Sequence, residues 1–174
     1  MTHWHTFTVY TGSPSTTFSK SATDDMIVFS GSKDNGTGVS WLYGIFPYLI
    51  DFSQINSITQ GLMSHATKFT GQYGDVTPFY ITIFNEDTII DDLINNYMSG
   101  NQHNPPESQI YADNLLLSQI IFQKESADYN TPEDITTDLS DINEKGYLGY
   151  CYKIQAGNGY GNNNWTRVYS IRFN

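Results

Sequence analysis

The residues best suited to chemistry lie in one short stretch, AGNGYGNNN, at positions 156–164. Three glycines there give the main chain conformational freedom: Gly157, Gly159 and Gly161. Four amide side chains accompany them: Asn158, Asn162, Asn163 and Asn164. Amide and main-chain carbonyl oxygens are suitable ligands for a hard cation such as Ca²⁺, and amides beside the rings of Tyr160 and Trp165 also suit a sugar. Asparagine and glycine are equally typical of turns, so simple turn formation is the alternative for this loop taken alone.

Two segments of alternating pattern flank this loop and must position it. In Tyr147–Gln155 one parity is apolar or aromatic: Leu148, Tyr150, Tyr152 and Ile154. In Trp165–Phe173 one parity carries Trp165, Arg167, Tyr169 and Ile171, and Val168 breaks the pattern. Alternating aromatic and β-branched residues indicate half-buried strands. We therefore expect two strands joined by a loop longer than a tight hairpin turn.

The composition favours a single all-β domain. The chain has 174 residues, of which 39% are hydrophobic, 15% aromatic and only 15% charged. A net charge of −10 argues against nucleic acid and anionic membranes as partners. No apolar run is long enough to span a membrane, so we expect no membrane insertion.

The cysteine count excludes an internal disulfide, because Cys151 is the single cysteine. The segment MTHWHTFTVYTG lacks the basic and apolar regions of a Sec signal. These features favour a cytoplasmic location, or release without a Sec signal peptide. Cys151 lies between Tyr150 and Tyr152, so we interpret it as a buried, inert thiol.

Other strands are expected along the chain, over Phe7–Tyr10, Thr16–Ser21, Asp25–Gly31, Val39–Phe46, Pro78–Phe84, Leu115–Gln123 and Ile135–Ile142. Pro47 is expected to stop the fourth of these, and Lys124–Asp134 to be a loop. Two segments show helical spacing: Asp51–Phe69, with Asp51 or Ser53 as cap, and Glu86–Ser99. The prediction is a two-sheet, jelly-roll-like β-sandwich spanning 1–174, with one or two short helical insertions.

Four segments together resemble the calcium-dependent, galactose-binding bacterial lectins of the LecA type. They are DMIVFSG after the strand opened by Trp4, the loop Gly100–Pro105 with His103, the apolar strand LLLSQIIFQ, and SDINEKGYLGYCYKIQ leading into GYGNNN. The segment Tyr160-Gly161-Asn162-Asn163 is the most specific of these matches. The resemblance covers about half the chain and leaves Pro47–Ser99 as a probable insertion.

The resemblance implies a calcium-assisted sugar site. Its metal ligands would be the carbonyls of Gly159 and Asn35 and the side chains of Asn162 and Asn163. His103 would hydrogen-bond a galactose-type sugar, which would pack on Tyr160 or Trp165. Gln155 stands where the family has an aspartate, so Ca²⁺ binding is expected to be weak or absent unless Asp34, next to Asn35, replaces that carboxylate from the other loop.

The sequence also bears on two other classes of function. No catalytic motif is present, and the acidic pairs of the chain suit caps and solvated surfaces, so we expect no enzyme. The low charge and the many tyrosines and asparagines also suit a self-associating structural or inclusion protein that binds no sugar. A homo-oligomer is expected both for a lectin and for a self-associating structural protein. A carbohydrate or glycoconjugate is the expected partner only of the lectin.

Overall fold

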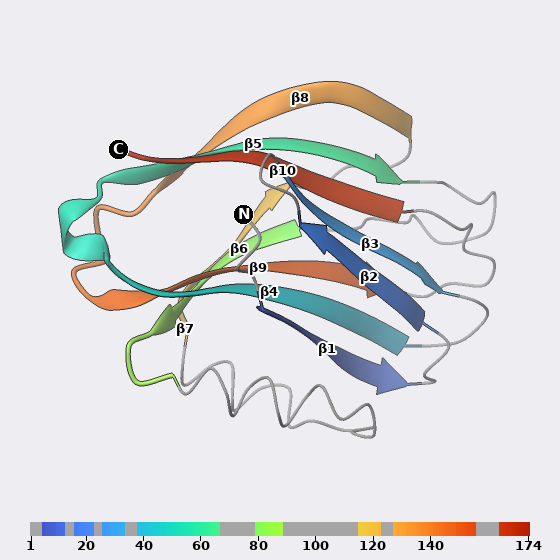
Figure 1. The fold of residues 1–174 in the computed structure, drawn as a ribbon, viewed down its shortest axis with the longest axis horizontal. Helices are drawn as coiled ribbons and strands as arrows, with labels where there is room; N and C mark the ends of the chain where they lie inside the picture. The colour runs from blue at the N-terminus through green and yellow to red at the C-terminus, as the bar shows by residue number, and fades with distance from the viewer. Residues whose placement is uncertain are drawn as a thin grey trace.

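The computed structural model describes residues 5–12, 16–22, 26–33, 38–66, 79–88, 115–122, 127–155 and 164–174. Within these ranges the chain forms ten strands and a short 3₁₀ helix, η1 (Figure 1). The strands are β1 (His5–Gly12), β2 (Thr16–Ala22), β3 (Ile27–Lys33), β4 (Gly38–Asp51), β5 (Ser57–Ala66), β6 (Phe79–Asn85), β7 (Leu115–Phe122), β8 (Ala127–Asp138), β9 (Lys145–Gln155) and β10 (Asn164–Phe173), and η1 spans Phe52–Gln54.

The strands form two five-stranded sheets that face each other. The first sheet has the order β1-β4-β9-β6-β7 and the second the order β2-β3-β10-β5-β8. Each pairing among the described strands is antiparallel. The predicted all-β, two-sheet sandwich is therefore confirmed. The two strands that flank the amide-rich loop, β9 and β10, are the central strands of the two sheets.

The core lies between the sheets and follows the period of two expected of strands. Ile27 and Phe29 of β3 are fully buried, as predicted. The β9 residues Leu148, Tyr150 and Tyr152 are each at most 1% exposed. The first sheet is also buried on its outer face, where Ile45, Phe84 and Cys151 are at most 2% exposed. The expected burial of the Cys151 thiol is confirmed.

The helix predicted over Asp51–Phe69 is wrong beyond its first turn. Asp51 does cap a helical turn, but η1 ends at Gln54 and the segment continues as β5. The inward residues of β5 are Ile58, Gln60 and Leu62, all fully buried. A polar residue at the middle inward position concealed the alternation and left the apolar residues at apparently helical spacing.

Several strand boundaries also differ from the prediction, and the strand expected over Ile135–Ile142 ends as β8 at Asp138. β4 runs through Pro47 to Asp51, because the register with β9 shifts between Ile45 and Leu49. Proline is tolerated at such an irregularity, where no ladder hydrogen bond is required of it. β8 begins at Ala127, inside the predicted loop, and contains Pro132, which an edge strand tolerates.

The region 47–99 contributes two interior strands, β5 and β6, one to each sheet. The expectation that this region is an insertion relative to the galactose-binding lectins stays a prediction. Glu86 and Asp87 form a turn after β6, in which the Thr88 N–H donates to the Asn85 carbonyl at 3.2 Å. The rest of the predicted helix, 89–99, lies outside the described residues.

Close packing between β6 and β9 predicts a strong effect of one added methyl group. A Cβ on Gly146 would meet the main-chain carbonyl oxygen of Phe84 and approach Ile83 Cγ2 to 3.1 Å. We expect Gly146→Ala to lower the free energy of unfolding by about 1–3 kcal/mol, measured by urea denaturation. The matched control is Gly61→Ala, whose Cβ would meet the rotatable Ser170 hydroxyl at 2.7 Å and should cost less. Equal stability of Gly146→Ala and wild type would contradict this packing.

Candidate functional site

Most residues of the predicted sugar and metal site lie outside the described ranges. These are Asp34, Asn35, His103, Gly159, Tyr160, Asn162 and Asn163. Gln155 ends β9, and its side chain is also outside the description. The strand ends that border this site are described.

Those strand ends lie together at one end of the sandwich (Figure 1). In the first sheet, Gln155 pairs with Val39. In the second sheet, Asn164 pairs with Gly31. Only positions 34–37 separate the end of β3 from the start of β4, so these two pairs belong to the same end. Hence the described strand ends that flank positions 34–37 and 156–163 share this end of the sandwich.

Trp165 is the one predicted sugar-binding residue whose side chain is described, and it is half-buried at the start of β10. The guanidinium carbon of Arg167 lies 4.1 Å from the centroid of its ring. This is a cation–π contact, and it occupies one face of the indole.

Trp165, Arg167 and Tyr169 form a row on the outer face of the second sheet, hereafter the Trp165 row. They alternate along β10 with Thr166 and Val168, which are fully buried in the core. Burial raises the pKa of the Tyr169 phenol, and the nearby charge of Arg167 opposes this shift. The Tyr169 hydroxyl is itself buried. The row therefore offers an aromatic surface and a cation, two groups that suit a polyhydroxylated ligand.

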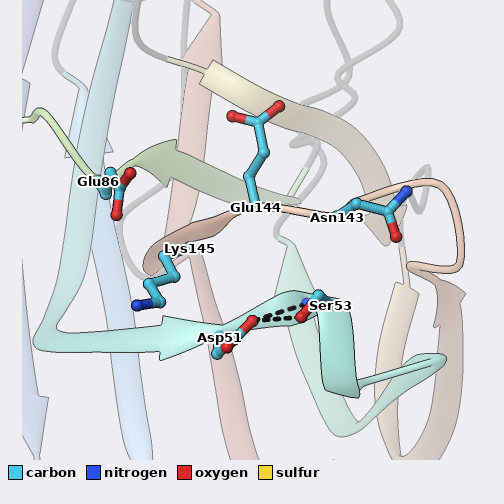
Figure 2. Close-up of a pocket in the computed structure, with 6 residues that line it drawn as sticks. All are labelled: Asp51, Ser53, Glu86, Asn143, Glu144 and Lys145. Carbon is cyan, nitrogen blue, oxygen red and sulfur yellow. Dashed lines mark hydrogen bonds between the residues drawn. The ribbon is translucent and has the colours of Figure 1, made fainter.

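A separate pocket lies at the opposite end of the sandwich, where β9 begins (Figure 2). Its volume is about 360 Å³, and its lining consists of Asp51, Ser53, Glu86, Asn143, Glu144 and Lys145, all exposed. The lining is polar throughout and contains no aromatic ring. Among the described residues, no group of three or more histidines, cysteines or acids is arranged to hold a metal ion.

Sequence reasoning missed this pocket because its residues come from separate segments. Asp51 and Ser53 lie at the end of β4 and in η1, Glu86 follows β6, and the remaining three lie between β8 and β9 or begin β9. The pairing of Asp51 with Lys145 brings these segments together. The only local signal was the prediction of Asp51 or Ser53 as a helix cap, and Asp51 is the residue that caps η1.

The electrostatics of the pocket centre on Asp51. Its Oδ1 accepts hydrogen bonds from the Ser53 hydroxyl at 2.6 Å and the Ser53 N–H at 3.2 Å. The hydroxyl bond is the main cause of a lowered Asp51 pKa, and the Lys145 charge adds to it. Figure 2 shows Asp51 and Ser53 joined by these bonds, with the Glu144 carboxylate pointing away from them.

No protein-family model matches the chain, and no curated protein matches its sequence. One similar solved structure is a carbohydrate-binding module of the beta-sandwich superfamily, with 13% identity and a TM-score of 0.46, covering 98% of this chain and 56% of that chain. A low-affinity xylan-binding module from Roseburia intestinalis has 12% identity and a TM-score of 0.40, covering 98% and 94%.

The enzymatically active domain of tailspike protein 4 of bacteriophage CBA120 is also similar, with 7% identity and a TM-score of 0.44, covering 99% of this chain and 19% of that chain. This chain spans about half the length of the first of the three structures. The assignment of a β-sandwich rests on the strand pairing of this chain itself. Within the described residues no helix is long and apolar enough to cross a membrane.

The hydrogen bonds of Asp51 predict a pH effect that Ser53 controls. Ser53→Ala removes the hydroxyl donor, so the Asp51 pKa should rise toward its ordinary value of 3.8. A carboxylate with a lowered pKa stabilises the fold above its unfolded pKa, and this contribution disappears as pH falls through the folded pKa. The variant should therefore lose part of that contribution.

Carboxyl ¹³C NMR titration measures this pKa directly, and Asp138 serves as an internal control. Its pKa is lowered by the Ser140 N–H, which donates at 2.9 Å, and by the Ser140 side chain. Ser53→Ala should leave Asp138 unchanged. An unchanged Asp51 pKa in the variant would refute the role of the Ser53 hydroxyl.

Proposed function

We propose that this protein binds carbohydrate at the end of the sandwich where β9 ends and β10 begins. The observation that supports this most directly is the Trp165 row, which begins two residues after the amide-rich segment 156–163 in the sequence. Aromatic rings pack against the C–H surface of a pyranose, and amide and guanidinium groups bond its hydroxyls. The proposal contains no catalytic step.

The finer assignment follows from the family resemblance. A galactose-type sugar is proposed, with His103 and the Asn162 and Asn163 amides addressing its hydroxyls. Ca²⁺ would be held by the same two amides and by the carbonyls of Gly159 and Asn35. Because Gln155 supplies no negative charge, this ion is proposed to be weakly held and to be an aid to binding rather than its basis.

A second candidate function is self-association without a sugar ligand. It is favoured by β7, the last strand of its sheet among the described strands. Ser118, Gln119 and Ile120 are exposed in succession, and β7 contains no charged residue. An open, uncharged strand edge can pair with another copy. Concentration-dependent association that galactose does not affect would favour this candidate.

The location of the sugar site predicts a distinct effect at each end of the sandwich. Trp165→Ala should weaken the binding of immobilised galactose-type glycans by about tenfold, measured by affinity electrophoresis or calorimetry, because an anchoring ring is lost. Phe173→Ala removes an exposed ring at the other end of β10 and should have no effect. Thermal melting checks that both variants remain folded.

Glu86→Gln tests the polar pocket in the same assay. It should leave glycan binding unchanged, since the pocket lies at the opposite end from Trp165. Loss of binding in Glu86→Gln, with Trp165→Ala unaffected, would move the sugar site to the pocket. Retention of all glycan binding in Trp165→Ala would remove the main support for the proposed site.

The missing carboxylate predicts the effect of restoring it. Gln155→Asp should strengthen Ca²⁺ binding by about tenfold or more, measured by calorimetry with and without galactose, because affinity rises with ligand charge. Gln155→Glu is the control, since it adds the same charge on a longer side chain. If Gln155→Asp titrates with Ca²⁺ as the wild type does, the metal assignment is wrong, while sugar binding through Trp165 is unaffected.

A further inference from the structure

Arg167 is a positive charge without an acidic neighbour in the described part of the chain. It pairs with Val28 of β3 and Met63 of β5, both uncharged. Arg172, on the same strand, differs from Arg167 in this respect, because it forms a salt bridge of 2.5 Å with Asp134. The chain carries 18 acidic residues and only eight lysines and arginines, so an arginine left out of such a pair is notable.

The contact with Trp165 leaves the hydrogen-bonding capacity of Arg167 largely unused. A guanidinium has five N–H donors, and a cation–π contact does not use them as hydrogen bonds to oxygen. The Nε of Arg167 is buried and makes no hydrogen bond within the described structure. The Trp165 contact at 4.1 Å also restricts the guanidinium, so a ligand would meet a partly ordered group.

The ligand that this arrangement fits best is a carboxylate. An arginine fork binds a carboxylate through two parallel hydrogen bonds, which are stronger than bonds to neutral hydroxyls. A sugar hydroxyl would use one donor and would leave the charge uncompensated. Because the net charge of −10 disfavours any anion at long range, a carboxylated ligand needs a local cation of this kind.

We infer that the sugar bound beside the Trp165 row carries a carboxylate, which the guanidinium of Arg167 holds while the indole of Trp165 supports both. The ligand class is then an acidic sugar of the uronic type, rather than a neutral hexose. This inference rests on the proposed carbohydrate function and specifies the substrate of the same site.

The test compares galacturonate with galactose, which differ at one carbon, by calorimetry at low salt. The wild type should bind galacturonate about tenfold more tightly. Arg167→Gln should lose this preference, because galacturonate binding should weaken much more than galactose binding, and Arg167→Lys should keep part of it. Arg172→Gln, the matched control, removes a positive charge from the same strand and should keep the full preference.

Each remaining outcome is informative. Equal binding of the two sugars by the wild type would overturn the inference and leave the carbohydrate function intact. A preference that persists in Arg167→Gln but disappears with EDTA would also overturn it, because a metal ion would then recognise the carboxylate. Failure of the wild type to bind either sugar would instead refute the proposed function itself.

Discussion

The sandwich depends on one cluster of three aromatic rings, which joins the two sheets. Phe79 and Tyr150, from neighbouring strands of the first sheet, stack with centroids 5.3 Å apart and rings 12° from parallel. Phe29 of the second sheet lies 5.3 Å from Phe79 and 6.3 Å from Tyr150. All three side chains are fully buried. Large rings of this kind contribute most of the buried apolar area, so they set how the sheets pack.

This aromatic cluster also brings a polar group into the core, and it restricts the register of β9. Tyr150 brings its hydroxyl into the core, where burial raises its pKa well above the ordinary value and the Gln60 amide from the opposite sheet only partly offsets that effect. The phenol therefore stays neutral at physiological pH. A slip of β9 by one residue would place Tyr150 on the outer face and Cys151 in the core. The core thus fixes the register of β9, and through it the position of Gln155.

The central positions of β9 and β10 connect the core with function. Each of these strands pairs on both sides, β9 with β4 and β6, and β10 with β3 and β5. A binding segment joined to such strands starts from a rigid support, which reduces the entropy lost on binding a ligand. The Trp165 row benefits in the same way, because Thr166 and Val168 anchor the alternate positions of β10 in the core.

The sequence by itself determined the fold class, most of the strands and the inward residues of β3 and β9, because alternation and turn residues are local properties. It failed where a polar residue lies in the core, as at Gln60, and where a strand passes an irregularity, as at Pro47. Only the tertiary structure decided that β9 and β10 belong to different sheets, that Arg167 covers one face of Trp165, and that Asp51, Glu86 and Lys145 share a pocket. These facts depend on pairing between distant segments, which sequence periodicity does not encode.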